Sequence, residues 1–87
     1  MQLAQTLDLG AAAPLWSEVS AARGQALELD ASAVERIGGP CLQVLLAARA
    51  QWERDGLAFA IRNPSPAFAD GLRLMGAGDL LPSEPTT

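Results

Sequence analysis

The stretch that decides the fold is ALELDASAVERIGGPCLQVLLAARAQW, residues 26–52. It opens with alternating apolar and polar residues over 26–30, which predicts a half-buried strand. The turn Gly38-Gly39-Pro40 follows, with its proline suited to the first turn of a helix. That helix is indicated by residues three and four apart that continue to Trp52, and Gly56 is placed to end it. A strand followed by a long helix predicts an α/β fold.

Upstream of this stretch, a short first strand is expected over the apolar residues that precede Gly10, where glycine permits a turn. A helix is expected over residues 11–22. Its apolar face is formed by residues at i, i+4 and i+7, namely Leu15, Val19 and Ala22. Pro14 is compatible with this helix only within the first turn, and Gly24 is placed to end it.

Downstream, residues 57–61 form a short apolar run, as expected of a strand buried in the middle of the sheet. Ser65 followed by Pro66 matches an N-cap and a first helical residue. The apolar face of this third helix, which ends before Gly76, is predicted at i, i+4 and i+7 as Phe68, Leu72 and Met75. The C-terminal part therefore repeats the strand-then-helix order.

The element order predicts one α/β domain over residues 1–81, with a small mixed sheet and three helices. A chain of 87 residues has room for a single core. Residues 82–87 are expected to form a flexible tail. The N-terminus lacks the features of a secretory signal, and no apolar run approaches the ~20 residues that cross a bilayer. We therefore expect a cytoplasmic protein without direct membrane insertion.

The composition excludes several function classes. The chain has no histidine, one cysteine and six basic residues, all arginines, against ten acidic residues, which gives a net charge of -4. The commonest general base, most zinc sites and an intramolecular disulfide are thereby excluded, and no basic patch is present for nucleic acid. Asp30, Ser32 and Asp8 are expected to cap turns or helices. We predict no catalytic residue, no metal and no cofactor, and so no enzyme.

Three segments together resemble the STAS family, named for sulfate transporters and anti-sigma-factor antagonists: residues 26–37, 42–48 and 63–76. The resemblance extends over residues 3–81. It implies a STAS-like α/β sandwich and a protein–protein interaction module of bacterial signal transduction. The implied partner is a signalling kinase, an anti-sigma-like ATPase domain or a transporter ATPase.

One turn departs from the pattern of this family. Many phosphorylatable members carry Asp-Ser-Ser-Gly where this chain has Gly38-Gly39-Pro40-Cys41. The acceptor position falls on Gly39, which has no hydroxyl, so serine phosphorylation is chemically unavailable at this turn. The resemblance implies partner contacts here, and the predicted partner-binding residues are Gly38, Gly39, Pro40, Cys41 and Gln43. The alternative is that the glycines and the proline only shape the turn.

Three hypotheses of function follow. The first is a STAS-type module of signal transduction, because the block around Gln43 resembles small stand-alone members linked with chemotaxis. The second is an accessory subunit that binds the ATPase of an ABC-type lipid transporter. The third is a redox protein or enzyme that depends on Cys41, although this cysteine is more simply a buried apolar residue. Trp52 is expected in the core, whereas Trp16 is compatible with either core or surface.

Overall fold

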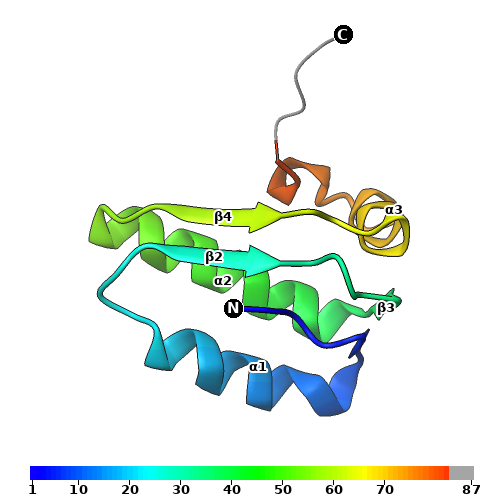
Figure 1. The fold of residues 1–87 in the computed structure, drawn as a ribbon, viewed down its shortest axis with the longest axis horizontal. Coiled ribbons are helices and arrows are strands. Elements are labelled where there is room, and N and C mark those ends of the chain that lie inside the picture. Colours follow the sequence, from blue (N-terminus) through cyan, green and yellow to red (C-terminus); the bar gives the residue numbers. More distant parts are fainter. Residues whose placement is uncertain (83–87) are drawn as a thin grey trace, which may run out of the picture.

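The computed structural model describes residues 1–82 and contains three α-helices, four short strands and one 3₁₀ helix (Figure 1). In chain order these are β1 (Thr6–Leu7), α1 (Leu9–Ala21), β2 (Leu27–Asp30), β3 (Arg36–Ile37), α2 (Gly39–Asp55), β4 (Phe59–Arg62), α3 (Pro66–Leu74) and η1 (Gly78–Leu80). The predicted α/β class with three helices is confirmed. Apart from Pro82, the expected tail lies outside the described residues.

The strands form two parallel pairs. β2 pairs with β4, in a register that sets Leu27 against Phe59, and β1 pairs with β3. A single parallel bridge from Gln2 to Asp30 joins the N-terminal segment to β2. The mixed sheet expected from the sequence is thus replaced, within residues 1–82, by parallel pairings alone.

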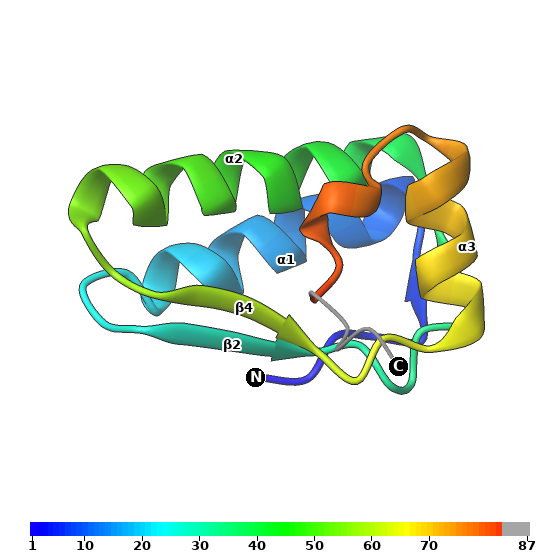
Figure 2. The ribbon, with the colours of Figure 1, turned by 90° about the horizontal axis from the view of Figure 1, so that it is seen from above.

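Both long helices lie on the same side of β2 and β4 (Figure 2). They run parallel to each other, as is shown by one contact between their starts and another between their ends. At the starts, the Cys41 thiol lies 3.2 Å from the Asp8 carbonyl oxygen. At the ends, Arg23 forms an ion pair of 3.3 Å with Asp55. In residues 1–82, no helix covers the opposite face of the two strands (Figure 2).

The core lies between the helices and the strands. Alternation along β2 buries Leu27 and Leu29 and leaves Glu28 exposed. Trp52 is 1% exposed, which confirms the predicted core position. The largest fully buried side chains come from β1, the three helices, β2 and the loop that follows β2: Trp52, Phe68, Leu7, Leu29, Leu45, Leu72, Val19, Val34 and Cys41. One core thus joins the elements of the described chain.

The start of α1 differs from the prediction. Asp8 caps the helix through a hydrogen bond of 3.2 Å that its carboxylate accepts from the Ala11 N–H, so α1 begins at Leu9. Gly10, expected to make a turn, lies inside the helix. Pro14 therefore falls beyond the first turn, where it removes one backbone hydrogen bond from the helix. The capping aspartate overrides the apolar pattern that favoured a longer first strand.

Two further strand predictions need correction. The sequence pattern predicts no strand at residues 36–37, but these residues form β3 and pair with β1. The strand after α2 begins at Phe59 rather than Leu57 and lies at an edge of its pair instead of mid-sheet. By contrast, Gly56 ends α2 in the left-handed conformation, and Ser65 caps α3, as predicted.

Candidate partner-binding surface

The start of α2 is held in place by main-chain contacts to β1. Gly38 has an extended backbone and donates its N–H to the Leu7 carbonyl oxygen at 2.9 Å. No side chain caps the helix, and Pro40 has no N–H to offer. Apart from its chain neighbours and the backbone of its own helix, a Cβ built on Gly39 would meet no atom within 4 Å. The turn is therefore firmly anchored, and Gly39 lies in open space where another protein's backbone could approach closely.

The five predicted binding residues divide by exposure. Gly39, Pro40 and Gln43 are exposed, and Gly38 is half-buried. Cys41 is fully buried, so its side chain cannot contact a partner. Burial raises the pKa of its thiol, and the nearby Asp8 carboxylate raises it further. The helix start therefore does not activate this cysteine, and the expected role as a buried apolar residue is confirmed.

A second set of exposed residues lies on α1. Leu9 is 76% exposed and Trp16 is 47% exposed. Trp16, for which the sequence allowed either core or surface, therefore lies at the surface. With the exposed Ala13 they recur at i, i+4 and i+7 and so share one face of the helix. Sequence reasoning missed Leu9 and Ala13 because it began the helix at residue 11. The signal that could have found them is Asp8 as an N-cap.

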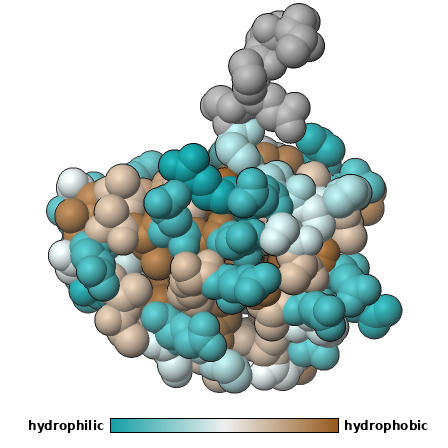
Figure 3. All heavy atoms as spheres, in the orientation of Figure 1, coloured by the Kyte–Doolittle hydropathy of each residue, from teal (hydrophilic) through white to brown (hydrophobic). Residues whose placement is uncertain are grey.

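These two sets lie on neighbouring parallel helices whose starts are in contact, and we treat them together as one surface. We call it the α1–α2 face and define it by its exposed residues: Leu9, Ala13, Trp16, Gly39, Pro40, Gln43 and Ala47. No charged residue occurs over 9–17 or over 39–48. The strand side differs, since hydrophilic side chains are spread over β2 and β4 (Figure 3), where Glu28 and Arg62 form an ion pair. An exposed surface without charge is typical of a contact site.

Chemical alternatives to binding have little support in this structure. Asp30 accepts the Ser32 N–H at 2.8 Å, as expected of a turn, and hydrogen bonds from Ser32 lower the pKa of the Asp30 carboxyl. Within residues 1–82, histidine, cysteine and acidic side chains nowhere gather in groups of three or more. Nor is any helix of this part long and apolar enough to span a bilayer. The α1–α2 face is therefore the strongest candidate site.

Comparison with known families gives a match over nearly the whole chain. The family model described as "Mlab, STAS domain" matches residues 1–82. No curated protein matches the sequence. The matched range contains every helix and strand described above, including both helices of the α1–α2 face.

Proposed function

We propose that this chain, which belongs to the STAS domain family, is a non-catalytic module. In this proposal it binds one protein partner through the α1–α2 face. The observation that carries the proposal is the absence of charge over residues 9–17 and 39–48, combined with the exposure of Leu9 and Trp16. Exposed tryptophan and leucine on an uncharged patch are costly in water and are stabilised by burial against another apolar surface.

Two partner classes remain for this module. The first is a signalling assembly, for example a kinase of a bacterial chemotaxis system, and the residues around Gln43 support it by resemblance. The second is the ATPase subunit of an ABC-type lipid transporter. The lack of charge supports this second class, since permanent interfaces are more apolar than transient ones. So does Gly39, because a turn without a hydroxyl leaves no phosphorylation switch to release the partner.

The proposed site is tested by two matched substitutions, Leu9→Glu on the α1–α2 face and Leu74→Glu on α3. Both leucines are largely exposed, at 76% and 87%, so neither change should unfold the chain. The tagged parent chain is used to purify its partner from cytoplasm, and mass spectrometry assigns the partner to a kinase assembly or a transporter ATPase. Leu9→Glu should weaken the association by about 10-fold, as for an interface position of moderate weight. Leu74→Glu should leave the association unchanged. The reverse pattern would place the interface on α3.

The turn before α2 should carry no phosphate after incubation with the purified partner and ATP. Gly38, Gly39 and Pro40 have no hydroxyl, and the Cys41 thiol is buried. Phosphopeptide mapping by mass spectrometry measures this directly. Phosphate at any position over 38–41 would contradict the prediction, whereas phosphate on Ser17 or Ser65 would reveal a different site.

A further inference from the structure

Gly71 lies in the middle of α3, although glycine stabilises a helix interior less than alanine does. Its φ is not positive, so the backbone conformation does not require glycine here. The requirement is for space: a Cβ built on Gly71 would lie 2.7 Å from the Cγ2 atom of Ile37. This is closer than two non-bonded carbon atoms pack. The helix α3 therefore lies against β3 at a distance that only a glycine allows.

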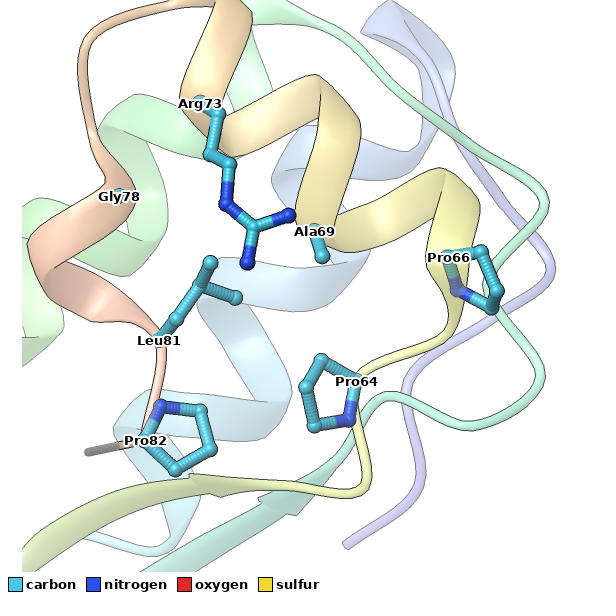
Figure 4. Close-up of a pocket in the computed structure, with 7 residues that line it drawn as sticks. All are labelled: Pro64, Pro66, Ala69, Arg73, Gly78, Leu81 and Pro82. Atoms are coloured by element: carbon cyan, nitrogen blue, oxygen red, sulfur yellow. The ribbon is translucent and has the colours of Figure 1, made fainter. Parts of the chain in front are cut away.

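The opposite flank of α3 contacts no strand. Pro66 and Ala69 line a hollow of about 440 Å³ there, and Figure 4 shows the Arg73 guanidinium extending over it. The helix is held from its inner side instead, where Phe68 and Leu72 are fully buried. The position of α3 is thus set by the core and by its contact with β3.

The segment on which α3 packs leads directly into the turn at the start of α2. Ser65, the N-cap of α3, donates its N–H to the Ala31 carbonyl at 3.1 Å and its hydroxyl to the Val34 carbonyl. Ile37 ends this segment and immediately precedes Gly38. In Figure 2, α3 lies at the end of the molecule where α2 begins. The helix therefore holds this segment at its start and at its end.

Ile37 cannot make room for a side chain at position 71 without a shift of its backbone. Its Cγ2 is bonded directly to Cβ, and a β-branched side chain has little freedom at χ1. Ile37 is also paired with Leu7 of β1, and the next N–H, that of Gly38, donates to the Leu7 carbonyl at 2.9 Å. A displaced Ile37 would therefore weaken the hydrogen bond that anchors the turn.

We infer that Gly71 is a positioning residue for the α1–α2 face. Because it has no side chain, α3 packs closely on Ile37, and this contact keeps Gly38 and Gly39 in place at the start of α2. Gly71 acts through Ile37 rather than by contact with a partner. The inference rests on the proposed function, since it concerns the same face.

Gly71→Ala in the full chain tests this role, with Gly78→Ala as the matched control. A Cβ on Gly78 would meet the Arg73 side chain at 3.6 Å, an ordinary contact. Amide hydrogen exchange, measured by NMR, should become at least about 10-fold faster at Gly38 in Gly71→Ala. The Leu27 amide, which is hydrogen-bonded elsewhere in the fold, should change by less than about 2-fold, and the control should change neither. Equal acceleration of both amides, or no change at Gly38, overturns the inference.

Partner affinity and a rescue variant complete the test. Gly71→Ala should weaken binding of the purified partner by about 3-fold to 10-fold. Ile37→Ala removes the Cγ2 atom, so the same change in that background should cost less than about 2-fold. An equal loss in both backgrounds, or faster exchange at Gly38 with unchanged affinity, overturns the inference.

Two further comparisons keep the result decisive. If Gly71→Ala does not fold, Ile37→Ala alone removes the contact from the β3 side and must speed exchange at Gly38 selectively for the inference to stand. Failure of the proposed function is seen separately, because Leu9→Glu alters the α1–α2 face without touching α3. The exchange measurement, in turn, requires no partner.

Discussion

Trp52→Ala should lower the free energy of unfolding by about 3 to 5 kcal/mol, as large-to-small aromatic substitutions do in cores. The indole is 1% exposed, and its N–H donates to the Gln25 carbonyl at 2.8 Å. Its ring also packs at a tilt against Phe59, with centroids 6.3 Å apart. Trp52 thus joins the end of α2 to the segment before β2 and to β4. Small domains are stable by only about 5 to 15 kcal/mol, so this loss is a large part of the total.

Urea denaturation followed by far-ultraviolet circular dichroism measures the loss, because this signal does not depend on the removed fluorophore. Trp52→Phe is the control: it keeps an aromatic ring and removes the hydrogen bond, which should cost about 1 to 2 kcal/mol. Gln25 is exposed, so water can replace the lost donor. A loss below 1 kcal/mol for Trp52→Ala would mean that the core around α2 closes over the cavity.

The helices were predictable from the sequence where capping and periodicity agree. Ser65 and Pro66 mark the start of α3, and Gly56 marks the end of α2, and the structure has both. The signals conflicted at the start of α1. There the apolar Leu9 favoured a strand, whereas Asp8 has the side chain of an N-cap, and the cap decided the outcome.

The short strands were harder to predict, for a physical reason. β1 and β3 have two residues each, so neither can show the alternation from which a strand is recognised. They exist because parallel pairing sets Leu7 against Ile37. That pairing depends on the tertiary fold rather than on local sequence. The edge position of β4 likewise follows from topology, because its apolar residues alone resemble those of a central strand.

The candidate surface was predictable in part. The exposed start of α2 follows from the Gly-Gly-Pro turn, and the structure leaves Gly39, Pro40 and Gln43 exposed. The contribution of α1 required the packing of two parallel helices, which no local pattern contains. Cys41 was included with the turn, although helical periodicity directs its side chain to the core. How much of α1 belongs to the α1–α2 face therefore depends on how α1 packs beside the start of α2.

Gly39→Glu should weaken partner binding by about 10-fold to 100-fold, equivalent to about 1.4 to 2.8 kcal/mol. The added side chain would extend into the open space next to Gly39, where a built Cβ meets no atom within 4 Å beyond the chain neighbours and the backbone of the same helix. It would also place the first charge within residues 39–48. If the partner's apolar surface covers this position, the carboxylate loses its water without gaining a counter-ion. Titration of the purified partner by isothermal calorimetry measures the loss.

The same substitution should change the free energy of unfolding only slightly, because two effects oppose each other. A carboxylate at a helix N-terminus interacts favourably with the helix dipole, by about 0.3 to 1 kcal/mol. Gly39 is the first residue of α2 and has no positive φ, but Pro40 follows it and disfavours a helical backbone at a residue that carries a Cβ. A denaturation curve on the same variant therefore accompanies the binding measurement, and weaker binding with little change in stability excludes unfolding as its cause.

Gly39→Ala distinguishes the two causes of the expected loss. The methyl group fills part of the open space but adds no charge. A loss of about 2-fold to 5-fold would indicate that the partner's backbone approaches Gly39 closely, whereas unchanged affinity would attribute the effect of Gly39→Glu to charge alone. If Gly39→Glu binds within 2-fold of the parent, the start of α2 lies outside the interface. The contact would then rest on α1, where Leu9 and Trp16 remain exposed.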